Sequence, residues 1–160
     1  MRNFVIGLIF GALLLSAIKK AKLKPGGYTT VILPGPHPVL TCIGLMPTNG
    51  DAYRTLSLAA KLVKGVSSHK PEAVGTFSLV AEAHADTVAE ALVAALLTAT
   101  EEQPTAKTKT AKPWPLRAVH VCGRLPASTI AQHTGAHLAR WLTQLPANVL
   151  NPDTYRRAAA

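Results

Sequence analysis

The stretch Gln144-Leu-Pro-Ala-Asn-Val-Leu-Asn-Pro-Asp-Thr-Tyr-Arg157 carries the clearest local structural signals in this chain. Pro146 is typical of a chain leaving a helix, because proline cannot continue the helical hydrogen-bond ladder. The tripeptide Asn151-Pro152-Asp153 predicts a second helix. Its asparagine can cap free amide groups, its proline suits the first helical position, and its aspartate is favoured near the positive end of the helix dipole. Because this second helix begins just before the sequence ends, we expect one domain of a longer protein that continues past Ala160.

Upstream of this junction, four runs have the composition of β-strands. They cover Tyr28–Leu33, Val39–Leu45, Gly75–Ala81 and Leu116–Cys122. A proline-rich turn separates the first two runs, which predicts a hairpin.

Helical patterns alternate with these strands. They predict helices that begin at Asn49 or Asp51, at Thr87 in a capping box closed by Glu90, and at Ser128 or Thr129. This alternation is typical of a layered α/β domain. We expect a mixed, mostly parallel sheet flanked by helices, similar to a macro domain.

The N-terminus is almost wholly apolar from Phe4 to Ile18 and is followed by Lys19, Lys20, Lys22 and Lys24. A membrane-spanning helix needs about 20 apolar residues, so this run is short for a membrane anchor. We interpret it as a core strand at Phe4–Phe10 and a helix from Gly11 to Leu23. An N-terminal membrane anchor stays open as an alternative.

The composition fits one domain, because a chain of 160 residues that is 48% apolar can fill a single core. We expect the α/β domain to cover residues 1–146 and a linker with the start of a helix to cover 147–160. The segment Glu101–Pro115 is rich in Pro, Thr and Lys and lacks periodicity, which predicts an exposed, mobile loop. Cys42 and Cys122 lie in apolar runs, so we expect small buried side chains rather than a disulfide.

One pair of side chains has the spacing of metal ligands. His133 and His137 are four residues apart, so both lie on one face of a helix. Thr134 occupies the position where zinc peptidase helices carry a glutamate, and no third ligand is evident in the sequence. We therefore interpret the pair as ordinary histidines, and we assign no metal, cofactor or catalytic residue in this chain.

The C-terminal stretch resembles the segment that joins the two domains of the leucyl (cytosol) aminopeptidase family. The resemblance rests on Ala139-Arg140-Trp141-Leu142, on Leu145-Pro-Ala-Asn-Val-Leu-Asn-Pro152 and on the following Tyr155. This chain has Pro146-Ala147 where the family commonly has two adjacent prolines. The resemblance implies a non-catalytic N-terminal domain with a structural role.

The same resemblance sets expectations for the whole protein. The parent enzymes release N-terminal residues from peptides in the cytoplasm, with two divalent metal ions, zinc or manganese. Those ions are held by the domain that would follow Ala160. The implied partners are the chain's own catalytic domain and the sister subunits of a hexamer.

The charge of the chain supports a second alternative. Lys and Arg number 17 against 8 Asp and Glu, a formal net charge of +9. A basic surface attracts nucleic acid, and Lys107, Lys109 and Lys112 are the candidate contacts. The basic residues are dispersed, however, and few aromatic side chains are present to stack on bases, which favours a solvated surface over a nucleic-acid-binding module.

Overall fold

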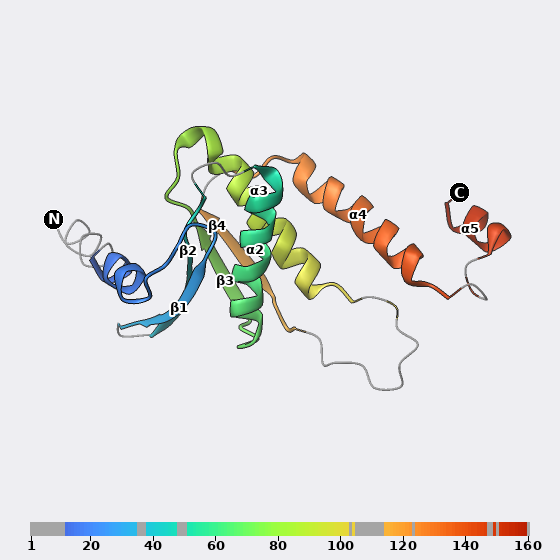
Figure 1. Ribbon diagram of the computed structural model, residues 1–160. Helices are drawn as coiled ribbons and strands as arrows, with labels where there is room; N and C mark the ends of the chain where they lie inside the picture. The colour runs from blue at the N-terminus through green and yellow to red at the C-terminus, as the bar shows by residue number, and fades with distance from the viewer. Residues whose placement is uncertain are drawn as a thin grey trace.

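The computed structural model describes residues 12–34, 38–47, 51–102, 104, 114–122, 124–146, 149 and 151–159 (Figure 1). Residues 12–20 are helical. The following elements are β1 (Tyr28–Leu33), β2 (Val39–Gly44), α2 (Ala52–Ser67), β3 (Ala73–Phe77), α3 (Glu82–Thr100), β4 (Ala118–Cys122), α4 (Ser128–Gln144) and α5 (Pro152–Ala159). Figure 1 shows α2 and α3 beside the strands, with α4 extending away from them and α5 near its far end.

The predicted hairpin is confirmed. β1 and β2 pair in antiparallel register, with Thr30 opposite Cys42. Helix α2 covers this hairpin, because it contacts both strands.

The second pair of strands is parallel. Ala73 of β3 pairs with Ala118 of β4, and α3 forms the connection between the two strands and packs on both. A parallel pair needs such a crossover, because the chain must return to the same end of the sheet. The α/β class is therefore confirmed.

The prediction of a single mixed sheet is wrong. The described strands form two sheets of two strands each, one antiparallel and one parallel. Alternating side chains show which face of a strand is buried, but they carry no information about which strand edges share hydrogen bonds. The two sheets are linked instead by α2 and α3, which pack against each other.

The main core cluster lies between these helices and the parallel strands. Val63, Leu96 and Trp114 are buried together, with Leu96 only 1% exposed. Val74 of β3 and Val119 of β4 pack against them. The prediction of an exposed loop over Glu101–Pro115 is wrong for Trp114, which is 9% exposed and whose indole Nε1–H donates to the Pro71 carbonyl at 2.8 Å.

The predicted starts of α2 and α5 are confirmed by their capping contacts. Asp51 Oδ1 accepts the Arg54 amide at 2.8 Å, and Asn151 Oδ1 accepts the Thr154 amide at 2.9 Å. The capping box at Thr87 is wrong, because α3 already begins at Glu82. Alanine and glutamate favour helix, so residues upstream of Thr87 join the same helix.

The predicted helix after Ala127 is present as α4, but the predicted cap at Ser128 or Thr129 is wrong, because both residues lie inside the helix, its N-cap is Ala127 and no side-chain hydrogen bond caps it. The Thr129 hydroxyl instead donates to Glu90 Oε1 on α3 at 3.1 Å. Both residues that the sequence assigned to helix caps thus meet each other between the two helices.

The expected strand at Phe4–Phe10 lies outside the described residues. The helix expected after it is present over 12–20. Of the helices in the part of the chain that the structure describes, none has the length and apolarity that a membrane crossing requires.

Two glycines within helices offer a matched test of the packing between α2 and the hairpin. A Cβ atom on Gly65 of α2 would lie 2.9 Å from Cys42 Sγ and 3.1 Å from Tyr28 Cε2, whereas one on Gly135 of α4 would meet nothing within 4 Å. We expect Gly65→Ala to lower the free energy of unfolding by about 1–2 kcal/mol through overpacking. Gly135→Ala should raise it by up to about 1 kcal/mol through helix propensity.

Urea denaturation followed by circular dichroism measures both changes. Equal stabilisation by the two substitutions would contradict the close approach of α2 to the hairpin.

Candidate functional site

The two histidines singled out in the sequence meet one carboxylate. His133 Nε2 lies 2.5 Å from Glu101 Oε1, and His137 Nδ1 lies 2.6 Å from Glu101 Oε2. Because His133 and His137 are one helical turn apart on α4, both imidazoles reach the same carboxylate. Glu101 directly follows α3, where its amide still bonds to the Leu97 carbonyl at 3.1 Å. The sequence could not reveal this carboxylate, because it lies 32 positions from His133.

Arg140 completes the group one turn further along α4. Its Nη2 lies 3.2 Å from Glu101 Oε2, and its Nη1 donates to Thr98 Oγ1 at 3.1 Å. The Arg140 Nε is buried without a hydrogen-bond partner. We name Glu101, His133, His137 and Arg140 the Glu101 cluster.

The Glu101 cluster ties α4 to α3. The side chain of Glu101 is 20% exposed and that of His133 is 8% exposed, so the contact between these two is largely shielded from water, whereas His137 and Arg140 lie nearer the surface. Both carboxylate oxygens already bind imidazole or guanidinium nitrogens. Within the described ranges, no group of three or more His, Cys, Asp or Glu side chains is arranged to hold a metal ion. The cluster therefore connects α4 to the end of α3 through polar contacts.

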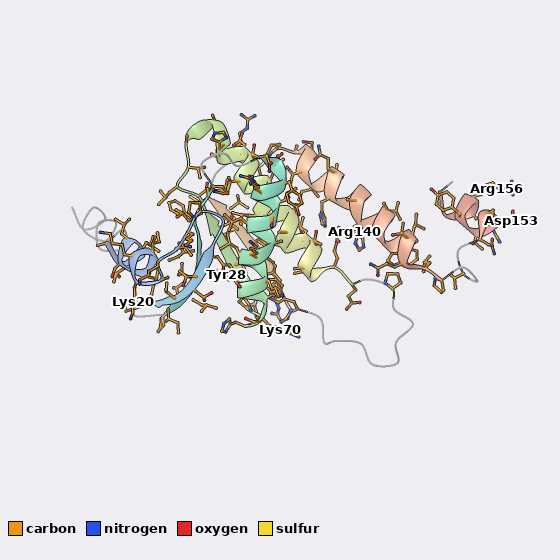
Figure 2. The ribbon with its side chains drawn as sticks, viewed as in Figure 1. Lys20, Tyr28, Lys70, Arg140, Asp153 and Arg156 are labelled. Atoms are coloured by element: carbon orange, nitrogen blue, oxygen red, sulfur yellow. The ribbon has the colours of Figure 1, made fainter. Side chains whose placement is uncertain are left out.

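Helix α4 also carries an apolar face that points to solvent. Ile130, Leu138 and Trp141 are 49%, 53% and 38% exposed. Their spacing places them on one side of the helix, next to the polar side that meets α3. Figure 2 shows Arg140 on α4, where this helix runs from the body of the domain towards α5. A helix with its polar side packed and its apolar side exposed has a surface suited to a partner.

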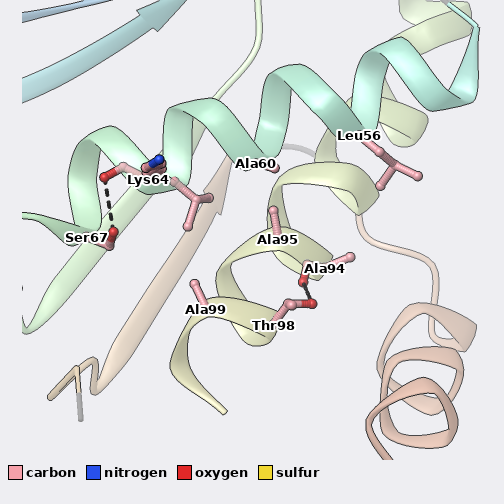
Figure 3. A pocket seen from close by; sticks show the side chains of 9 residues that line it. Leu56, Ala60, Lys64, Ser67, Ala94, Ala95, Thr98 and Ala99 are labelled. Atoms are coloured by element: carbon pink, nitrogen blue, oxygen red, sulfur yellow. Dashed lines mark hydrogen bonds between the residues drawn. The ribbon is translucent and has the colours of Figure 1, made fainter. Parts of the chain in front are cut away.

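A shallow apolar groove runs between α2 and α3 (Figure 3). Its walls are mostly small apolar side chains, including Ala60, Ala94 and Ala95. The hydroxyls of Ser67 and Thr98 donate to carbonyls of their own helices at 3.0 Å and 2.7 Å. Ligand sites orient small molecules with a few convergent polar groups, and these two hydroxyls are already engaged within the helices.

The cysteines are free thiols, with Cys42 half-buried and Cys122 exposed, so the expectation that both are buried is wrong for Cys122. Burial raises the pKa of the Cys42 thiol, and the hydrogen-bonding contact with Thr30 Oγ1 at 3.5 Å opposes this shift. A raised pKa lowers the thiolate fraction that a nucleophile needs. The candidate nucleic-acid contacts Lys107, Lys109 and Lys112 lie outside the described residues.

Comparisons with known proteins bear on the fold. No family model and no curated protein matches the chain. Among solved structures, a mutant of tomato leucine aminopeptidase matches with a TM-score of 0.65 at 17% identity. The match covers 96% of this chain and 33% of the aminopeptidase chain. This chain has the fold of part of a leucine aminopeptidase. It spans about a third of that protein's length.

Proposed function

We propose that this chain is the non-catalytic N-terminal domain of a leucyl-aminopeptidase-like metallopeptidase. The observation that carries the proposal is the structural match, which extends over 96% of this chain but only 33% of a leucine aminopeptidase. The family resemblance of the Gln144–Arg157 stretch supports the same assignment. Peptide hydrolysis in the cytoplasm would then belong to the remaining part of such a protein.

The exposed side of α4 supports a structural role. Ile130, Leu138 and Trp141 form an exposed apolar surface on α4, the helix that precedes α5 in the sequence. Burying such side chains stabilises an interface by about 25 cal/mol for each Å² of apolar surface. We propose that this surface packs against the catalytic domain, and that the domain helps to hold sister subunits in an oligomer.

The two divalent ions of the parent family do not fit the described residues. The histidine pair with ligand spacing is bonded to Glu101, and Arg140 brings a positive charge to the same carboxylate. A guanidinium at that position repels a cation. In the proposed protein the ions would be held by the other domain.

The mass and activity of the native protein test the assignment. We expect an antibody against this chain to capture a product much larger than 16.8 kDa that hydrolyses leucine 4-nitroanilide when supplied with zinc or manganese ions. The isolated chain should show no such hydrolysis. A native product of 16.8 kDa without peptidase activity would refute the proposal.

A charge placed on α4 tests the interface in the captured protein. Leu138→Glu should lower the oligomer mass in light scattering and reduce peptidase activity at least about tenfold, because it buries an unpaired carboxylate in the contact. Gln132→Glu is the matched control, since it adds the same charge at an exposed position on another side of α4. Equal effects of the two substitutions would argue against an interface at Leu138.

A further inference from the structure

The Asp, Glu, Lys and Arg content of the N-terminal part of the chain is entirely basic. Its first 50 residues contain no Asp or Glu. Lys19, Lys20, Lys22 and Lys24 are all exposed, and no ion pair among the described residues involves them. Figure 2 shows Lys20 at the end of the molecule opposite α5. The helix dipole favours cations in the last helical turn. Lys22 and Lys24 lie beyond the helix at 12–20, so the dipole does not explain their presence.

The turn after this helix is held in place and adjoins a fifth lysine. The Gly26 amide donates to the Leu45 carbonyl at 2.7 Å, and the Gly27 amide donates to the Lys24 carbonyl at 2.9 Å. Lys61 of α2 reaches the same turn, with its Nζ 3.4 Å from the Gly26 carbonyl. The lysines are therefore carried by an ordered backbone.

An apolar side chain lies beside these charges. The helix at 12–20 exposes Leu15 to 60%, one turn before Lys19 on the same side of the helix. Leu13, Leu14, Ala17 and Ile18 lie on the other side and are half-buried. The outward side thus combines an apolar group with a cluster of lysines.

We infer that the helix at 12–20 and the lysines that follow it bind the surface of an anionic phospholipid membrane. Lysines near such a surface are attracted to its negative lipids, while exposed apolar side chains on a helix enter the boundary between headgroups and acyl chains. Leu15 favours a lipid surface over nucleic acid, which offers phosphates but no apolar layer. This inference does not depend on the proposed function.

Vesicle flotation with the full chain tests the inference. We expect binding to vesicles of phosphatidylcholine with phosphatidylserine, and little binding to phosphatidylcholine alone. Raising the salt concentration from about 0.1 M to about 0.5 M should release the protein, because the attraction is screened. The salt titration needs no variant, so it decides the charge dependence even if a substitution disturbs folding.

Two sets of substitutions locate the surface. Replacing Lys19, Lys20, Lys22 and Lys24 with glutamine should weaken binding by roughly several hundredfold, at about fivefold for each lysine. The control variant replaces four other exposed cations, Arg54, Lys64, Arg124 and Arg156, with glutamine and loses the same net charge. It should retain most of the binding. Leu15→Ser should weaken binding without changing its dependence on phosphatidylserine.

Three results would overturn the inference. They are equal binding to both kinds of vesicle, equal loss in the two charge variants, or absence of vesicle binding by a chain that binds DNA through the same lysines. The last result would assign the surface to nucleic acid instead.

Discussion

Trp114→Ala is expected to lower the free energy of unfolding by about 3–5 kcal/mol. Trp114 is 9% exposed and is buried with Val63 of α2 and Leu96 of α3, so truncation leaves a large cavity between the helices and the strands. It also removes the donor that binds the Pro71 carbonyl at 2.8 Å just before β3. Urea denaturation measures the change.

The second tryptophan is the control for this substitution. Trp141 is 38% exposed on α4, so Trp141→Ala in the isolated chain should cost less than about 1 kcal/mol. Trp114→Phe separates the two contributions of Trp114, since it retains an aromatic ring but loses the N–H donor. Its cost should be intermediate. Equal costs for the two tryptophan-to-alanine variants would contradict the burial of Trp114.

Glu101→Ala is expected to lower the free energy of unfolding by about 2–3 kcal/mol and to loosen α4. The substitution removes the acceptor of His133, whose side chain is 8% exposed, and of Arg140, whose Nε already has no partner. Leaving buried polar groups unpaired carries this cost. Hydrogen exchange should show the amides of α4 losing protection more than those of α2, because the described contacts of the Glu101 cluster join α4 to the end of α3 and involve no residue of α2.

The neighbouring residue provides the control for this prediction. Glu102 is exposed and carries the same charge, so Glu102→Ala should change stability by no more than about 0.5 kcal/mol. Similar losses of protection in both variants would mean that charge near α3, rather than the Glu101 cluster, holds α4.

Features that depend on neighbouring residues could be predicted from the sequence. The start of α5 follows from Asn151 and Pro152, and the hairpin follows from two β-rich runs around a proline-rich turn. In each case the hydrogen bonds connect residues that are close in the chain. The same local rules fail at Thr87, where favourable helix formers upstream extend α3 past a plausible cap.

Features that depend on distant residues could not be predicted. Glu101 and Trp114 both lie in a stretch without periodicity, yet one holds the histidines of α4 and the other fills the core. On α4 the apolar pattern itself misleads, since Thr129 and His133 are buried while Leu138 is exposed. These polar side chains are buried because Glu90 on α3 and Glu101 at its end are their hydrogen-bond partners. The spacing of residues along α4 cannot indicate partners that lie elsewhere in the chain.

The order of the strands has a consequence for how the chain folds during synthesis. Tyr28 pairs with Gly44 through one turn, but Ala73 pairs with Ala118 only after the whole of α3 has been made. Closing the longer loop costs more entropy and slows folding. We expect the hairpin to form early, while β3 stays unpaired until β4, which ends at Cys122, has left the ribosome. For that interval the apolar side chains of α3 that later face β4 are open to chaperones and to neighbouring chains.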